Sequence, residues 1–224
     1  MRRLLRVLIL LVPTAAVASP PPSPGLLCDA AIVGAERSAH LPLRLLGAIA
    51  EVESGRLDDA GNVRPWPWTI NAEGRGQFFA SKQDAIDAVR ALQAQGVRSI
   101  DVGCMQVNLM FHPNAFASLD EAFNPAANAL YAARFLNTLY GMSGSWVQAT
   151  AAYHSQTPAI GADYEQRVMA RWQHRGPVFG APLTQTAYRD FTPKAQVYGA
   201  FQPADQVYGA FAEPAPMPTR LAHR

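Results

Sequence analysis

A chain of 224 residues and 24.2 kDa, 49% of them hydrophobic, is long enough for one ordinary domain with its own core. Three of its 19 Lys and Arg residues, Arg2, Arg3 and Arg6, stand at the very beginning, so the rest carries 16 basic against 17 acidic residues. A remainder so close to neutral excludes a protein that binds nucleic acid through a strongly basic surface.

The first 18 residues have the composition of a secretory signal peptide. The three arginines precede an apolar run at residues 7–12, and Ala16 and Ala18 form an A-x-A cleavage pattern. Because spanning a bilayer takes about 20 apolar residues, an uncleaved membrane anchor is the secondary interpretation. We therefore expect residues 1–18 to direct export to the periplasm.

Residues 19–27 follow as a proline-rich leader. Four prolines within residues 19–25 favour an extended backbone, so we expect this stretch to stay outside any helix. From Cys28 onward apolar residues recur at intervals of three and four, which is the helical pattern. The folded domain is expected to span residues 28–175.

The two cysteines of the chain are Cys28 and Cys104. An exported protein meets an oxidising compartment, where such a pair usually closes, and a loop of this span stabilises a fold by about 4 kcal/mol in the chain-entropy model. We therefore predict a disulfide. Two unpaired buried thiols are the alternative.

Several of the expected helices begin with a recognisable cap. Ser81 and Asp84 resemble a capping box, and Asn124 precedes a proline that is compatible with the first helical position. The pattern predicts helices at residues 28–38, 42–54, 82–95, 105–111, 125–140, 145–154 and 162–173.

Residues 66–79 separate the second and third of these helices. Two β-favouring stretches flank a glycine-containing turn there, which predicts a small hairpin. Its aromatic residues, Trp66, Trp68, Phe78 and Phe79, either line a binding groove or form a local hydrophobic cluster. The predicted fold class is α+β and predominantly α-helical.

Proline, alanine, glutamine and glycine dominate residues 176–224. A six-residue sequence at 196–201 recurs at 206–211, but two short copies are too few for a solenoid. We expect a flexible tail, with the alternative that its tyrosines and phenylalanines bind a partner or the domain surface.

The strongest local signal is the sequence EVESG at residues 51–55, which ends the second expected helix. Helical geometry places Glu53 on the face of Leu46 and Ile49, while Glu51 lies on another face. Apolar neighbours and the negative end of the helix dipole both favour a protonated carboxyl at Glu53, as a general acid needs. Taken alone, an ordinary helix-terminal glutamate paired with an arginine is the better interpretation.

Other motifs change that balance. Glu53 and Ser54 match the Glu-Ser pair that closes a core helix in the soluble lytic transglycosylase family, and the sequence GCMQ at residues 103–106 matches the second motif, Gly-x-Met-Gln. The third, Ala-Tyr-Asn, is altered to Ala-Tyr-His at residues 152–154, and the later family tyrosine corresponds to Tyr164. In order and spacing, residues 43–172 resemble this family.

The resemblance implies a lysozyme-like fold that cleaves glycan strands of peptidoglycan between N-acetylmuramic acid and N-acetylglucosamine. It implies that Glu53 acts alone, first as acid and then as base, and that 1,6-anhydromuramic ends form without consuming water. No cofactor or metal is expected. The substrate-binding residues that it implies are Ser54, Gly103, Met105, Gln106, Tyr153, His154 and Tyr164.

Each of these residues also has a purely structural interpretation. Gly103 lets the backbone approach the sugar, Gln106 offers a polar contact, and Met105 supplies an adaptable wall or packs at a helix start. Tyr153 and Tyr164 either bond near the acid and the glycan or are core tyrosines. His154 stands where the family has asparagine, so its contacts are expected to differ.

Two alternative functions stay open. A second carboxylate at Asp58, Asp59, Glu73 or Asp101 gives a hydrolytic muramidase instead, because two carboxylates are the usual equipment of a glycosidase. A non-catalytic glycan-binding or assembly protein is the other alternative. We expect the tail to be the part that meets any secretion, pilus or flagellar assembly.

Overall fold

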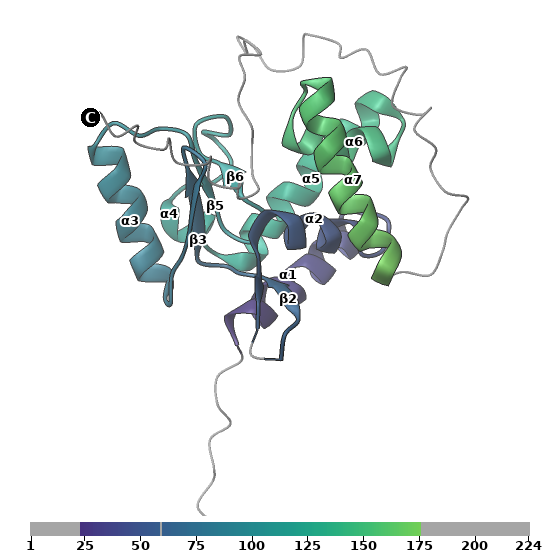
Figure 1. The fold of residues 1–224 in the computed structure, drawn as a ribbon. Helices are drawn as coiled ribbons and strands as arrows, with labels where there is room; N and C mark the ends of the chain where they lie inside the picture. Colours follow the sequence, from purple (N-terminus) through teal and green to yellow (C-terminus); the bar gives the residue numbers. More distant parts are fainter. Residues whose placement is uncertain (1–22, 59, 176–224) are drawn as a thin grey trace, which may run out of the picture.

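The computed structural model describes residues 23–58 and 60–175 (Figure 1). The expected signal peptide and the tail with its repeat lie outside these residues. The helices are α1 (Pro24–Ser38), α2 (Leu45–Ser54), α3 (Lys82–Ala94), α4 (Leu119–Ala122), α5 (Pro125–Ser143), α6 (Trp146–His154) and α7 (Pro158–Arg175). The strands are β1 (Gly55–Leu57), β2 (Val63–Pro65), β3 (Thr69–Ala72), β4 (Arg75–Phe78), β5 (Ile100–Val102) and β6 (Val107–Asn108).

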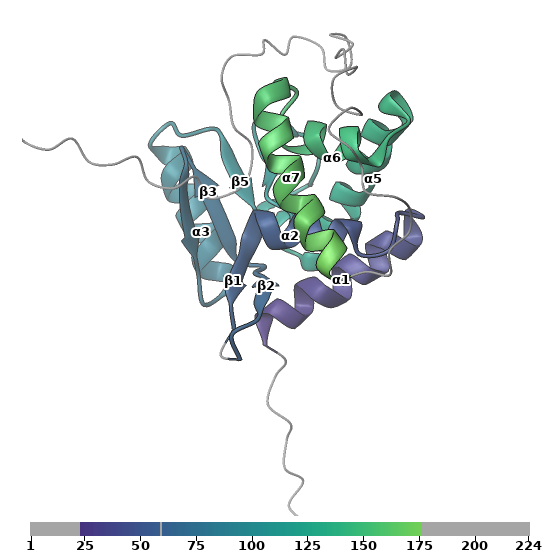
Figure 2. The ribbon, with the colours of Figure 1, turned by 45° about the vertical axis from the view of Figure 1, so that its right-hand side comes forward.

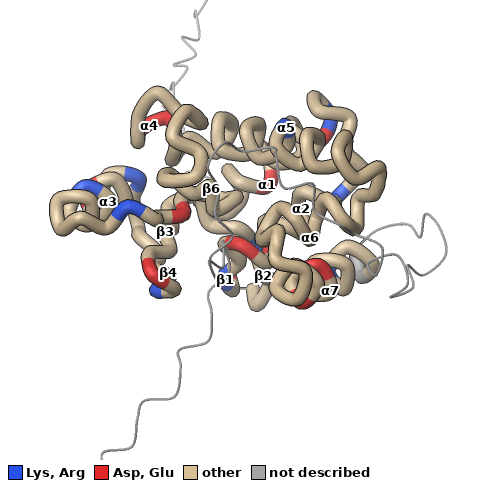
Figure 3. Tube along the Cα trace, turned by 90° about the horizontal axis from the view of Figure 1, so that it is seen from above, with Lys and Arg blue, Asp and Glu red and all other residues tan. Residues whose placement is uncertain are grey.

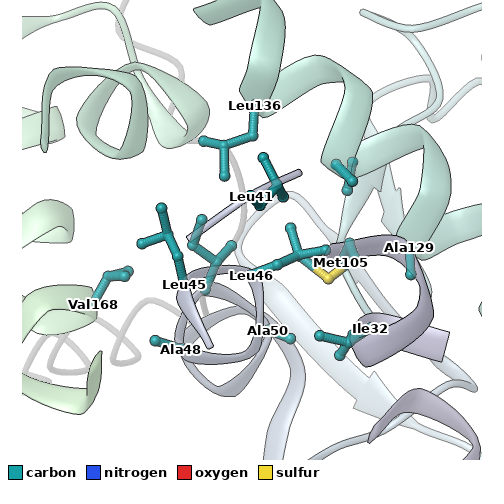
Figure 4. Close-up of a cluster of buried hydrophobic side chains, with 14 of the residues drawn as sticks. Ile32, Leu41, Leu45, Leu46, Ala48, Ala50, Met105, Ala129, Leu136 and Val168 are labelled. Carbon is teal, nitrogen blue, oxygen red and sulfur yellow. The ribbon is translucent and has the colours of Figure 1, made fainter. Parts of the chain in front are cut away.

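Most helices form one lobe. Helix α1 packs against α5, α6 packs against both α5 and α7, and α2 packs against α7. In the close-up of this core, side chains from the surrounding helices converge on Leu45 and Leu46 of α2 (Figure 4). The apolar side chains of α2 are buried against these neighbours, and apolar burial is the main source of stability. These contacts therefore fix the position of α2 in the helical lobe.

A small antiparallel sheet and α3 form the second lobe. The strand order is β4-β3-β5-β6, and α3 lies over one face of the sheet (Figures 1 and 2). Seen from above, α3, β3 and β4 lie on one side of the molecule and α5, α6 and α7 on the other, with acidic and basic residues scattered over both (Figure 3).

The alternation of side chains separates the two faces of the sheet. Ile70 and Val102 pack in the core that α3 covers. The register pairs Asn71 with Asp101 and Asp101 with Asn108, so these three side chains share the opposite face. The sheet therefore presents a buried polar row on the side away from α3.

The beginning of α2 is capped by another helix. Arg44 precedes it with φ +66°, and the buried Glu36 carboxylate of α1 accepts hydrogen bonds from Arg44 N and Gly47 N, both at 3.1 Å. Burial raises the pKa of Glu36, and these backbone donors oppose that shift. The start of α2 is thereby fixed to α1.

The fold class is confirmed as α+β and predominantly helical. The expected hairpin exists as β3 and β4, which pair as an antiparallel two-strand unit within the larger sheet. Ser81 caps α3 and Asn124 caps α5, as predicted. The hairpin of β1 and β2 and the short α4 were not predicted.

Two local expectations are wrong. The leader does not stay outside the helices up to residue 27, because α1 begins at Pro24, and a proline in the first turn needs no N–H donor. Residues 105–111 form no helix. Gly103 and Gln106 have φ of +81° and +48°, and the Asn108 side chain accepts from the following backbone N–H groups, so the chain turns into β6 instead.

The predicted disulfide between Cys28 and Cys104 is present. It joins α1 to the segment that links β5 with β6, and both cysteines lie in the core of the helical lobe. None of the helices in the described part of the chain has the length and apolar character that crossing a membrane requires.

Candidate active site

Glu53 lies at the end of α2 and is only 1% exposed. Its Oε1 atom accepts a hydrogen bond of 2.6 Å from the Tyr164 hydroxyl, which reaches it from α7. Burial and then the nearby Glu53 raise the pKa of Tyr164 well above its usual value. Tyr164 therefore stays protonated and acts as a permanent donor to the carboxyl group.

Ser54 connects the same helix end to the second motif. Its hydroxyl donates to the carbonyl oxygen of Cys104 at 2.6 Å, and the side chain is fully buried. From α6, the Tyr153 hydroxyl donates to the carbonyl oxygen of Met105 at 2.9 Å. The structure therefore brings the three sequence motifs together around the backbone of residues 103–106.

Asn128 of α5 supports this segment, and sequence analysis missed it. Its Oδ1 accepts from Met105 N at 2.9 Å, and its Nδ2 donates to the carbonyl oxygens of Val102 and Ala122, both at 3.0 Å. A Cβ at Gly103 would lie 2.6 Å from Asn128 Nδ2, so the missing side chain makes room for this amide. The signal in the sequence is a lone asparagine on an otherwise apolar helix face.

Met105 and Gln106 differ in their surroundings. Met105 is fully buried in the core of the helical lobe and has no surface for a ligand. Gln106 donates from Nε2 to the Gly103 carbonyl oxygen at 3.0 Å, while its buried Oε1 has no hydrogen-bond partner among the described residues. An acceptor left unsatisfied in this way is costly unless a ligand or water meets it.

A small pocket opens beside Gln106. Half-buried Tyr153 lines it, as do Asn108, His112, Tyr131 and Phe135. The Tyr131 hydroxyl lies 2.8 Å from His112 Nδ1, and burial lowers the pKa of His112 to about 4. The pocket thus combines aromatic walls with uncharged polar groups, and its open volume of about 20 Å³ is close to that of one water molecule.

His154 ends α6 and is 2% exposed. Its ring stacks on the Tyr164 ring, with centroids 4.4 Å apart and an interplanar angle of 5°. Burial, and then Arg167, lower the pKa of His154 to about 3, so the imidazole is neutral in any ordinary medium. Its Nδ1 is buried without a hydrogen-bond partner in the described part of the chain.

The candidate second carboxylates occupy different places. Asp58 accepts from the backbone of its own loop and pairs with Arg64, and exposed Glu73 pairs with Arg75. Asp101 is buried in the polar row of the sheet, where its Oδ1 accepts from Asn108 Nδ2 at 2.7 Å. Asp59 lies outside the described residues.

Tyr153 lies within the electrostatic reach of Glu53 and of one of these candidates, Asp101. Burial, then Glu53, and more weakly Tyr131 and Asp101, raise the pKa of Tyr153 well above its usual value. Among the described candidates for a second carboxylate, Asp101 is therefore the one that contributes, as Glu53 does, to the electrostatic field at Tyr153.

The aromatic residues of the hairpin divide into two groups. Trp68 and Phe79 pack against the core of the sheet lobe, as expected of a hydrophobic cluster. Trp66 contacts Trp68 edge to face, and the Arg56 guanidinium lies 4.0 Å from the centroid of its ring. Phe78, with 39% of its surface exposed, is the most exposed of the four aromatic residues.

No three His, Cys, Asp or Glu side chains of residues 23–58 and 60–175 come together in a way that could hold a metal ion. The comparisons with known proteins add one finding. The family model for the transglycosylase SLT domain matches residues 30–169, a range that contains every motif residue from Glu53 to Tyr164. No curated protein and no solved structure matches the chain.

Proposed function

Because the chain belongs to the transglycosylase SLT domain family, we propose that it is a lytic transglycosylase of peptidoglycan with Glu53 as its catalytic acid and base. The single observation that carries this assignment is the hydrogen bond from Tyr164 to Glu53 at the buried end of α2. It gives one carboxyl group a fixed orientation next to the three motifs of the family.

The surroundings of Glu53 support its role as an acid. Burial removes water from the carboxyl group, and the end of a helix adds the negative end of the dipole, so both favour the protonated form. The Tyr164 donor favours the carboxylate and therefore eases the loss of the proton. A group balanced in this way can give a proton and take one back.

The proposed reaction has two steps. Glu53 first protonates the glycosidic oxygen between N-acetylmuramic acid and N-acetylglucosamine, and the bond from that oxygen to the anomeric carbon of the muramic sugar breaks. The Glu53 carboxylate then removes the proton from the 6-hydroxyl of the same sugar, whose oxygen forms a new bond to the anomeric carbon. The product is a 1,6-anhydro ring, and the proton ends on Glu53.

The pocket beside Gln106 is the proposed contact for the glycan. Tyr153 and Phe135 offer flat apolar surface there, and the buried Gln106 Oε1, which has no hydrogen-bond partner among the described residues, would accept from an acetamide N–H once its side chain turns toward the pocket. Ser54 and Met105, by contrast, are fully buried, so we assign them to holding the site together rather than to touching the sugar.

A hydrolytic muramidase is the second candidate, and Asp101 is the observation that favours it. Its carboxylate is fixed by Asn108 and contributes to the field at Tyr153, as Glu53 does. In that reaction Asp101 would activate a water molecule while Glu53 protonates the leaving oxygen. The two reactions differ in whether water enters the product.

Peptidoglycan lies outside the cytoplasm, so an enzyme that cuts it works there. We propose export to the periplasm through residues 1–18, and the disulfide agrees with an oxidising compartment. A role for the tail in meeting a secretion, pilus or flagellar assembly stays a prediction.

The test of the acid is Glu53→Gln, which preserves the shape of the side chain and removes the proton donor. We expect the rate of muropeptide release from purified peptidoglycan to fall by at least about a hundredfold, because a general acid typically contributes this much. Glu51→Gln is the matched control, since it makes the same change two residues away, on another face of α2. It should keep a rate close to that of the wild type.

Lytic activity in Glu53→Gln that equals the wild-type rate would remove Glu53 from the mechanism. A wild-type protein that binds glycan strands but releases no muropeptide would favour the non-catalytic alternative. Thermal melting of each variant checks that the change in rate does not come from unfolding.

A further inference from the structure

Two aromatic rings from consecutive helices stack next to Glu53, and one of them carries the hydroxyl that bonds to it. The His154 ring of α6 and the Tyr164 ring of α7 are nearly parallel at 5°, with centroids 4.4 Å apart, and both side chains are almost completely buried. Ring stacking of this kind holds the two planes against each other. The orientation of the Tyr164 ring therefore depends on the histidine beside it.

The Tyr164 side chain places its hydroxyl group, the hydrogen-bond donor, next to Glu53. Its hydroxyl lies at the far end of the ring and donates to Glu53 Oε1 at 2.6 Å. A rotation about the Cα–Cβ bond of Tyr164 would swing the whole ring, and the hydroxyl with it, away from the carboxyl group. A side chain packed on the face of the ring opposes this swing, and His154 packs on that face.

We propose that His154 is a positioning residue of the active site, whose ring holds Tyr164 in the orientation that aligns the Glu53 carboxyl group. The proposal deepens the lytic transglycosylase function proposed above and rests on it. It also gives the His154 substitution a purpose, because the asparagine of the family motif has no ring to stack on a tyrosine.

The charge state of His154 agrees with a role in which its ring acts by packing and not by its charge. Burial and Arg167 keep His154 neutral, and Arg167 also lies 5.6 Å from the centroid of the Tyr164 ring. His154 Nδ1 has no hydrogen-bond partner among the described residues, so the ring is held by packing rather than by a polar bond from that atom. A flat apolar ring is expected to serve the same purpose.

The test compares a ring with a side chain that has none. His154→Phe keeps a flat ring and should retain at least about a third of the wild-type kcat, whereas His154→Leu fills similar space without a plane and should lose about tenfold or more, since small misplacements of a catalytic group are costly. KM for glycan strands should change little in both, because the proposal concerns the acid and not the binding of sugar.

A double-mutant cycle shows whether His154 acts through Tyr164. In the Tyr164→Phe background the hydroxyl is already absent, so His154→Leu should cause no further loss of kcat. Losses in kcat that multiply in the double variant would overturn the proposal. A loss in His154→Phe equal to that in His154→Leu would overturn it as well.

A spectroscopic measurement makes the outcome independent of activity. The titration of the Glu53 side-chain carboxyl, followed by ¹³C NMR, should shift in His154→Leu in the same direction as in Tyr164→Phe and remain near the wild-type curve in His154→Phe. A wild-type curve in His154→Leu contradicts the positioning role. If the wild-type protein releases no anhydro product, the proposed function fails while this titration still decides the role of His154.

Discussion

Two effects make glycine necessary at residue 103: its backbone has a positive φ, and the Asn128 amide occupies the space that a side chain would need. The φ of +81° is unfavourable for any residue with a side chain, and a Cβ would meet the Asn128 amide at 2.6 to 3.0 Å. Asn128 accepts from Met105 N of the second motif, and its amide also donates to the carbonyl oxygens of Val102 and Ala122. A side chain at residue 103 would therefore displace the amide that keeps residues 103–106 in place.

Gly103→Ala is predicted to lower the free energy of unfolding by about 3 kcal/mol or more, because it adds backbone strain and disturbs the bonds of Asn128. Gly74→Ala is the matched control. Gly74 has a similar φ of +76°, but apart from its chain neighbours no heavy atom of the described residues lies within 4 Å of the position that a Cβ would take there. It should therefore cost only the strain, about 1 to 2 kcal/mol.

Urea unfolding of the two variants measures the difference. Equal losses of stability at the two glycines would show that Asn128 moves aside without cost.

His112 and His154 make stability depend on pH. Burial lowers the pKa of His112 to about 4 and that of His154 to about 3, whereas both titrate near 6.5 in an unfolded chain. The stabilisation is therefore complete above about pH 6.5 and is lost as the pH falls toward 4 and 3. Each histidine should lower the free energy of unfolding by up to about 1.4 kcal/mol per pH unit in this window.

Urea unfolding at pH 7, 6, 5 and 4.5 measures this slope. The two histidines together contribute to this slope because each takes up one proton on unfolding. His154→Gln removes one of these two groups and should therefore remove about half of the histidine contribution. An unchanged slope in His154→Gln would show that His154 is not buried as a neutral ring.

At the level of secondary-structure elements, the sequence predicted those parts of the fold that carry local signals. The caps at Ser81 and Asn124 fixed the starts of α3 and α5, and the apolar stripe of α2 identified the helix that ends in Glu53. The predicted hairpin matched because its turn contains Gly74 at positive φ.

The segment after Gly103 was misread because its apolar spacing resembles a helix. Two residues with positive φ, one of them Gln106, break that pattern, and no composition signal marks a glutamine for this conformation. Strands β5 and β6 were missed because strands of three and two residues are too short to show a period of two. The pairing of β5 with β3 also joins residues that are distant in sequence.

The same reason limits what sequence reveals of the site. The sequence motifs point to Glu53, Tyr153 and Tyr164 as candidates, but the bond between Tyr164 and Glu53 joins residues that lie 111 apart. Asn128 and the stack of His154 on Tyr164 depend on how α5, α6 and α7 pack, which no local pattern specifies.

The disulfide also joins separate elements of the fold, since it links α1 to the segment that carries the second motif. Replacing both Cys28 and Cys104 by alanine is predicted to lower the free energy of unfolding by about 4 kcal/mol, the loop-closure contribution for a loop of this length. Urea unfolding of the double variant and of the reduced wild type measures it. A loss below about 1 kcal/mol in both would mean that the bond constrains little of the unfolded chain.

For the molecule as a whole, the site lies where the helical lobe and the sheet lobe are joined. Ser54 bonds to Cys104, Tyr153 bonds to Met105, and Asn128 bonds to Val102 of β5, so each link runs from a helix to the segment around the end of the sheet. The Glu53 carboxyl group belongs to one lobe and the Asp101 carboxylate to the other. In the proposed transglycosylase reaction Glu53 would act in both steps, whereas in the alternative hydrolase Asp101 would activate a water molecule.

The most direct measurement is digestion of purified peptidoglycan in water enriched in ¹⁸O, followed by mass spectrometry of the released muropeptides, for the wild type and for Asp101→Asn. The account predicts anhydromuramic ends without ¹⁸O from both proteins, because the attacking oxygen belongs to the substrate. Reducing ends that carry ¹⁸O and disappear in Asp101→Asn would contradict it and identify a hydrolase with Asp101 as its second carboxylate.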